Sequence, residues 1–140
     1  MLSKNSKQTQ AFAKDLATKL DKPTVLALYG ELGSGKTTFI QGLALGLGIE
    51  KRILSPTFVF QRSYKLQDRP FRYFHHVDLY RAASLADAKT TGIEETLSEK
   101  DTLVAIEWPE VIEDLLPPET IKIQFNKLGE SEREITVAGL

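Results

Sequence analysis

The sequence has no cysteine and only two histidines among its 140 residues. The absence of cysteine excludes disulfides, thiolate metal sites and cysteine nucleophiles, and two histidines argue against a multi-histidine zinc site. No apolar run approaches the ~18 residues that a transmembrane helix needs. The first eight residues lack the apolar core of a secretory signal. We therefore expect a cytoplasmic protein without membrane attachment.

The composition is that of an ordinary globular protein, with 41% hydrophobic and 26% charged residues. A chain of this length can bury roughly two-thirds of its unfolded surface, so we expect residues 1–140 to form one domain. The charge is uneven, because residues 51–81 carry 7 basic and 2 acidic side chains, whereas residues 82–140 carry 5 and 13. Such asymmetry can steer partners, and the basic segment is a candidate surface for an acidic partner.

Apolar residues recur with the periods of helices and strands along most of the chain. The expected helices cover 6–20, the stretch from a glycine-rich turn to about 47, a short segment capped by Ser84 and interrupted near Gly92, and a segment beginning at Pro109. The expected strands are Thr24–Tyr29, Thr57–Leu66, Phe71–Leu79, Thr102–Ile106, Thr120–Phe125 and Glu134–Val137. This alternation predicts a three-layer α/β fold with a mostly parallel central sheet and β-rich additions.

The segment from Gly30 to Thr37 reads Gly-Glu-Leu-Gly-Ser-Gly-Lys-Thr and matches the Walker A pattern. It follows a predicted buried strand and opens a predicted helix. Its glycines let the backbone wrap around phosphate oxygens, and successive amides at the helix N-terminus bind the anion. Lys36 is expected on the β- and γ-phosphates and the Thr37 hydroxyl on Mg²⁺. The expected nucleotide contacts are Gly30, Glu31, Leu32, Gly33, Ser34, Gly35, Lys36, Thr37 and Thr38.

A P-loop enzyme also needs an acidic residue at the end of a neighbouring strand to hold the metal. Glu107 follows the apolar run Leu103–Ile106, and Asp78 follows the mixed run Tyr73–Val77. Apolar patterning favours Glu107 as the carboxylate on the Mg²⁺ side. Asp78 is then expected either to lie near the metal without binding it directly or to orient the attacking water. Which carboxylate touches the metal stays open at this stage.

Other motifs concern the γ-phosphate and the base. Ser55–Phe58 lies where P-loop switches carry a hydroxyl that senses the γ-phosphate, which makes Thr57 a candidate. Asn126–Gly129 resembles the guanine-reading Asn-Lys-x-Asp pattern, but glycine replaces its carboxylate. Asp78–Arg81 likewise lacks the glycine of the GTPase Asp-x-x-Gly switch. Both departures favour ATP over GTP.

Two aromatic side chains lie beside the candidate acids. His76 precedes Asp78 by two residues and so shares its strand face, where a structural and a catalytic role are both open. Trp108 follows Glu107 and is expected either in the core or near the nucleotide.

Five segments, in this order and spacing, resemble the TsaE family. They are the P-loop, Ser55–Phe58, His76-Val-Asp-Leu-Tyr-Arg81, Gly92-Ile-Glu94 and Ile106-Glu-Trp-Pro109. These are small bacterial ATPases of tRNA threonylcarbamoyladenosine (t6A) biosynthesis. The resemblance covers about residues 9–137. It implies a slow ATPase that binds the TsaD–TsaB pair and supports the modification of adenosine 37, with tRNA met indirectly or within the assembly.

The resemblance also implies roles position by position. Carried over in this way, the functional residues are Lys36 for the phosphates, Thr37 and Glu107 for Mg²⁺, Asp78 as an essential acid, Thr57 as a switch threonine, Trp108 beside the acid, and Thr9 and Arg133 along the outer side of the nucleotide. The stretch 85–91 departs from the glutamate- and leucine-rich pattern usual in the family.

We therefore expect an Mg²⁺-dependent ATPase switch, with Lys36, Thr57, Asp78 and Glu107 as its catalytic residues. Intrinsic turnover is expected to be low, because no arginine finger is evident near the P-loop. A small-molecule P-loop kinase stays open as an alternative, although the sequence has no arginine-rich lid segment. A non-hydrolysing nucleotide-binding scaffold also stays open. The oligomeric state is not predicted.

Overall fold

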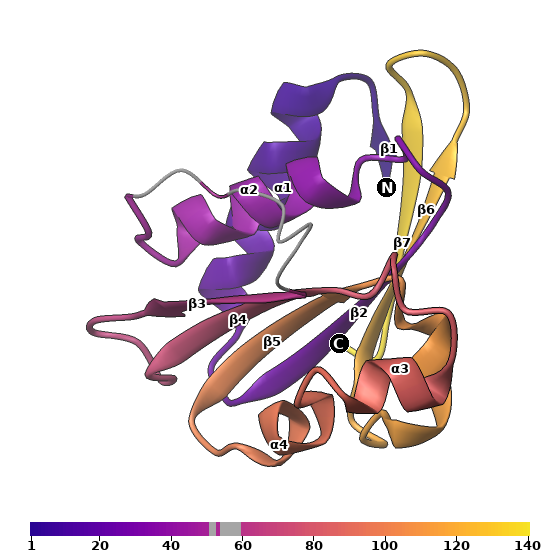
Figure 1. The fold of residues 1–140 in the computed structure, drawn as a ribbon. Coiled ribbons are helices and arrows are strands. Elements are labelled where there is room, and N and C mark those ends of the chain that lie inside the picture. Colours follow the sequence, from indigo (N-terminus) through magenta and orange to yellow (C-terminus); the bar gives the residue numbers. More distant parts are fainter. Residues whose placement is uncertain (51–52, 54–59) are drawn as a thin grey trace.

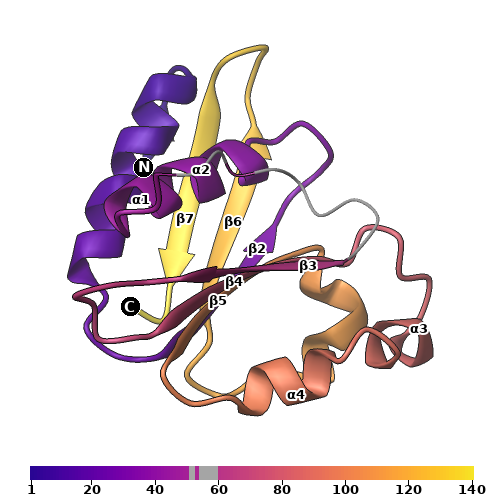
Figure 2. The ribbon, with the colours of Figure 1, turned by 60° about the vertical axis from the view of Figure 1, so that its left-hand side comes forward.

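The protein, described here by a computed structural model over residues 1–50, 53 and 60–140, is built around one mixed β-sheet (Figure 1). Helices α1 and α2 cover one face, while α3, α4 and the 3₁₀ segment η1 lie on the other (Figure 2). The helical elements are α1 (Ser6–Lys19), α2 (Lys36–Gly46), α3 (Leu85–Lys89), α4 (Ile93–Ser98) and η1 (Pro109–Leu115). The predicted three-layer α/β fold is confirmed.

The sheet has the strand order β1-β7-β6-β2-β5-β4-β3 within the described residues. The strands are β1 (Leu2–Ser3), β2 (Thr24–Tyr29), β3 (Gln61–Lys65), β4 (Tyr73–Asp78), β5 (Thr102–Glu107), β6 (Ile121–Lys127) and β7 (Arg133–Ala138). The four central strands pair in parallel, and the outer strands β3, β7 and β1 pair antiparallel. Of these outer strands, β3 and β7 belong to the predicted β-rich additions.

Parallel pairing brings the candidate site together at one edge of the sheet. Glu107 is the register partner of Leu28 on β2 and of Asp78 on β4. The Gly-rich loop begins directly after β2. The carboxyl ends of three neighbouring strands therefore place both acids and the loop side by side, where α/β sheets bind ligands.

The sequence explains the ends of the first helical layer. The Asn5 side chain caps α1 by accepting from the Gln8 amide at 2.9 Å. Helix α2 ends before Gly48, whose positive φ of 79° is the conformation that glycine adopts most easily. Gly92 has a φ of 83° and separates α3 from α4, as predicted.

The structure departs from the sequence-based expectations at several elements. Strand β1 was not predicted, because two residues are too few to show a period. The segment after Pro109 is a 3₁₀ helix. Of the expected strand 57–66, the part before Phe60 lies outside the described residues. In the part of the chain that the structure describes, no helix is both long and apolar enough to cross a bilayer.

Close contact between α1 and α2 gives a stability prediction. A Cβ on Gly42 would lie 2.3 Å from the Gln10 carbonyl oxygen of α1, which is backbone and cannot move aside cheaply. We expect Gly42→Ala to lower the free energy of unfolding by about 1–3 kcal/mol, because overpacking forces the helices apart. Urea denaturation measures this difference. Gly129→Ala is the matched control, since nothing lies within 4 Å of its Cβ position, and equal stability of the two variants would contradict the packing argument.

Candidate functional site

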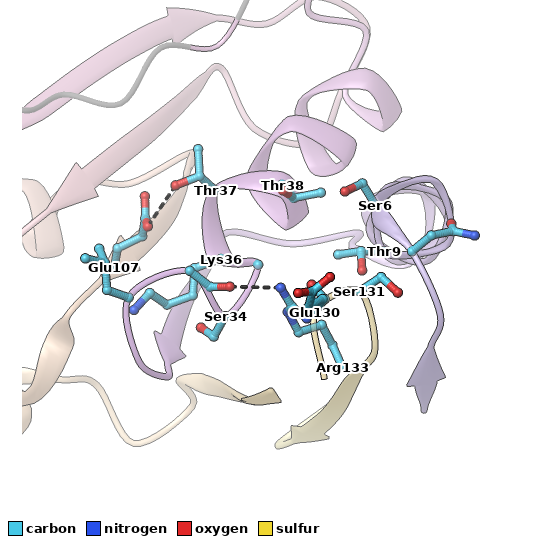
Figure 3. Close-up of a pocket in the computed structure, with 14 residues that line it drawn as sticks. Ser6, Thr9, Ser34, Lys36, Thr37, Thr38, Glu107, Glu130, Ser131 and Arg133 are labelled. Atoms are coloured by element: carbon cyan, nitrogen blue, oxygen red, sulfur yellow. Dashed lines mark hydrogen bonds between the residues drawn. The ribbon is translucent and has the colours of Figure 1, made fainter. Parts of the chain in front are cut away.

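A cavity of about 270 Å³ lies over the loop between β2 and α2 (Figure 3). The loop contributes Leu32–Thr38 to its wall, and Glu107 lies on one side. The start of α1 and the turn between β6 and β7 contribute the rest. Of the predicted loop contacts, Gly30 and Glu31 do not line this cavity but a separate hollow, together with Trp108 and Phe125.

The loop backbone follows a path that requires glycine. Gly33 and Gly35 have φ values of 77° and 104°, in the left-handed region. A Cβ on Gly30 would lie 2.8 Å from the Phe125 carbonyl oxygen, so the loop passes too close to β6 for any side chain. The first turn of α2 presents amides that have no intrahelical acceptor. Such amides at a helix N-terminus suit an anion, and phosphate above all.

Two buried polar atoms belong to residues of the cavity wall. Among the residues that the structure describes, Ser34 Oγ and Arg133 Nε have no hydrogen-bond partner. Both residues line the cavity. A buried polar group without a partner costs free energy, and a polar ligand would relieve that cost only if these side chains turned toward it.

Lys36 is almost fully buried, with 4% of its surface exposed. Its ammonium donates to the Gly30 carbonyl and lies 3.6 Å from the centroid of the Trp108 ring. Burial lowers the pKa of Lys36, and the negative charge of Glu107 opposes this shift. A bound anion beside Nζ would further stabilise the charged lysine.

Trp108 turns the chain from β5 into η1. Its φ of 57° is left-handed, a conformation that costs a non-glycine residue about 1–3 kcal/mol. The turn places one side of the indole by Lys36, and the Tyr80 ring lies 5.1 Å from the indole. Trp108 therefore lies beside the loop lysine and also packs against the core cluster that contains Val77 and Ile106.

Glu107 lies at the centre of a chain of hydrogen bonds. Thr37 Oγ1 donates to Oε1 at 3.2 Å, and His76 Nε2 lies 2.7 Å from Oε2 (Figure 3 shows the Thr37 bond). The Glu107 side chain is buried, with 3% of the residue exposed. The predicted metal residues Thr37 and Glu107 are thus in direct contact, whereas the bond from His76 was not predicted.

The oxygen donors of Thr37 and Glu107 fit Mg²⁺ bound together with a nucleotide. Mg²⁺ prefers oxygen ligands and commonly uses one or two protein groups together with substrate phosphates and water. Over residues 1–50, 53 and 60–140 there is no group of three or more His, Cys, Asp or Glu side chains that could hold a metal alone. The arrangement therefore suits a nucleotide-bound metal better than an all-protein metal cage.

Of the other two predicted catalytic residues, Asp78 is among the described residues and Thr57 is not. Asp78 lies beside Glu107 across the β4–β5 pair, and its Oδ1 accepts from the Tyr80 amide at 2.9 Å. It does not line the main cavity. Thr57, with the rest of Ser55–Phe58, lies outside the described residues.

Thr9 and Arg133 line the cavity from elements far apart in the sequence (Figure 3). The Arg133 guanidinium donates to the Gly33 carbonyl at 3.0 Å, which connects β7 to the loop. Ser6 and Ser131 also line the cavity and were not predicted. Only the packing of α1 and the β6–β7 turn around the loop brings these residues together, and no local motif marks them.

The chain is similar to known proteins over nearly its whole length. The family model described as "Threonylcarbamoyl adenosine biosynthesis protein TsaE" matches residues 3–135. The chain is 37% identical to the tRNA threonylcarbamoyladenosine biosynthesis protein TsaE of Treponema pallidum over 137 residues, covering 98% of both proteins. It is also 37% identical to the protein of that name from Bacillus subtilis over 132 residues, covering 94% of this chain and 80% of the relative.

A solved structure shows the same fold. The crystal structure of Bacillus subtilis YdiB superposes with a TM-score of 0.76 at 35% sequence identity, covering 98% of this chain and 82% of that one. The family match over nearly the whole chain and the relatives at this identity lead to one conclusion: the protein belongs to the TsaE family, the threonylcarbamoyl adenosine biosynthesis proteins.

Proposed function

We propose that the protein is the ATP-binding and slowly hydrolysing component of tRNA t6A37 biosynthesis, acting as a nucleotide-driven switch with a TsaD–TsaB pair. The observation that carries the proposal is the glycine-rich loop, which brings the start of α2 and a buried lysine to the same cavity as Thr37 and Glu107. Family membership supports the pathway.

In this proposal the loop amides and Lys36 hold the triphosphate. Thr37 and Glu107 hold Mg²⁺, which when bound would offset the negative charge that develops on the phosphates. Asp78 or a nearby group orients the attacking water, and Thr57 senses the γ-phosphate. Positioning and charge stabilisation of this kind account for most of the catalysis in phosphoryl transfer.

The contacts of Arg133 support low intrinsic turnover and a contribution from a partner. The guanidinium of Arg133 is engaged with four backbone carbonyls and lies at the loop's outer side. A partner that completed the site would raise turnover. Exposed basic side chains near β3 and β4 offer a surface for an acidic protein or tRNA, at Arg62, Lys65, Arg69 and Arg72.

Phosphate release tests the proposal. We expect the protein to release phosphate slowly from MgATP and to change that rate when TsaD and TsaB are added, and t6A formation to require a hydrolysable nucleotide. TsaD–TsaB alone and a non-hydrolysable ATP analogue are the controls. No release above these controls would favour the scaffold alternative, and a phosphorylated small molecule in a metabolite screen would favour the kinase.

A further inference from the structure

We propose that His76 is a positioning residue that fixes the Glu107 carboxylate, so that its Oε1 faces Thr37 and the metal of the nucleotide. This inference rests on the proposed function, because it concerns the same site. His76 is completely buried, and its Nε2 lies 2.7 Å from Glu107 Oε2. Its register partner on β5 is Ala105, so the ring reaches along the strand toward Glu107.

The partners of the ring decide where its proton lies. An ionised carboxylate can only accept, so Nε2 donates to Glu107. Nδ1 has no partner among the described residues. A proton on Nδ1 would leave a buried N–H unpaired, so a donor at Nε2 fits these surroundings. The ring thereby offers one fixed donor to one oxygen of Glu107.

The two oxygens of Glu107 have different partners, which gives the carboxylate an orientation. Oε2 accepts from His76, and Oε1 accepts from Thr37. The terminal torsion of a glutamate is broad, so the carboxylate can rotate when one partner is lost. Without His76, the orientation of Oε1 would depend on Thr37 alone. Partners of this kind, one step removed from a metal, commonly govern its affinity.

The neighbouring residue on β4, His75, provides a matched control for His76. His75 is also buried, at 5% exposure, and its Nε2 also lies 2.7 Å from a glutamate oxygen, that of Glu99. Its Nδ1 pairs with Ser63 Oγ at 2.7 Å. Because neighbouring side chains on a strand point to opposite faces, His75 faces away from the loop. A general effect of removing a buried histidine from β4 would appear at both positions.

The experiment measures ADP affinity by calorimetry, once with Mg²⁺ and once with EDTA, for the wild type and three variants. We expect His76→Leu to weaken ADP binding in Mg²⁺ by about 10- to 100-fold, and to change the affinity in EDTA by less than about twofold. His76→Gln keeps a donor near the position of Nε2 and is expected to recover most of the Mg²⁺ effect. His75→Leu is expected to leave both affinities unchanged.

Other results would contradict either the positioning role of His76 alone or the proposed function as well. The positioning role would be overturned if His76→Leu weakened ADP binding equally with and without Mg²⁺. It would also be overturned if His75→Leu weakened ADP binding in Mg²⁺ as much as His76→Leu does. If Mg²⁺ strengthened ADP binding by the same factor in the wild type and in His76→Leu, the inference would fail while the proposed function stood. If the wild type bound no nucleotide under either condition, both would fail.

A second measurement does not depend on the variants folding. In nitrogen-15 NMR of the wild-type imidazoles, we expect the Nε2 resonance of His76 to shift further on adding MgADP than on adding ADP in EDTA. The Nε2 resonance of His75 is expected to respond equally to both additions. Identical responses of the His76 resonance to both additions would overturn the inference even if His76→Leu did not fold.

Discussion

Replacing Lys36 by alanine is expected to abolish detectable nucleotide binding. In titration calorimetry the wild type should bind MgATP at one saturable site, whereas Lys36→Ala should bind at least about 100-fold more weakly. Two hydrogen bonds from a charged donor to phosphate, each contributing about 1.5–3 kcal/mol, account for a loss of this size.

The environment of Lys36 explains why this residue should have the largest effect. Its ammonium is buried, and its pKa is lowered by that burial. The only hydrogen-bond acceptor that Nζ has among the described residues is the Gly30 carbonyl, and the Trp108 ring covers another side. Phosphate oxygens would supply the negative partner that a buried cation needs.

A second lysine separates this effect from a general loss of charge. Lys122 also lies over an aromatic ring, that of Tyr29 at 5.9 Å, but it is half exposed and paired with Glu113. We expect Lys122→Ala to bind MgATP with wild-type affinity. Wild-type binding by Lys36→Ala would remove Lys36 from the site and contradict the assignment of the loop.

Replacing Glu107 by glutamine is expected to lower kcat for ATP hydrolysis by about 100-fold or more, while nucleotide binding without Mg²⁺ persists. Glutamine keeps the shape of the side chain and removes its charge. Because Glu107 is buried and contacts Thr37, few other groups near the loop can take over its role. Single-turnover phosphate release, with calorimetry in EDTA, separates the chemical step from binding.

Glu99 provides the control for this variant. Its carboxylate lies 2.7 Å from the ring of His75, as that of Glu107 does from His76, but it lies on the other face of the sheet. Glu99→Gln is therefore expected to keep wild-type kcat. Full turnover by Glu107→Gln would show that another carboxylate, such as Asp78, carries the charge that the mechanism assigns to Glu107.

The features that the sequence predicted well are local or depend on one simple pattern. The loop is a contiguous motif of eight residues, and its position between a buried strand and a helix followed from the apolar run Thr24–Tyr29. The apolar run before Glu107 predicted a buried strand that ends at this residue, and that strand pairs directly with β2, whereas the role of Glu107 at the metal stays a prediction. Parallel pairing then brings these elements together.

The remaining features depend on packing that no local pattern records. The bond between His76 and Glu107 requires the exact register of β4 on β5, which a shift of one residue would abolish. Arg133 reaches the Gly33 carbonyl only because β7 pairs with β6 beside β2. The left-handed turn at Trp108 could not be predicted either, because tryptophan rarely adopts that conformation.

The decisive experiment is a crystal structure with Mg²⁺ and a non-hydrolysable ATP analogue. We expect the triphosphate on the amides of Gly33–Thr38, Lys36 turned from the Gly30 carbonyl to the phosphates, and the metal beside Thr37 and Glu107. An analogue bound elsewhere, or a loop whose amides stay covered by the protein's own side chains at saturating analogue, would contradict this expectation.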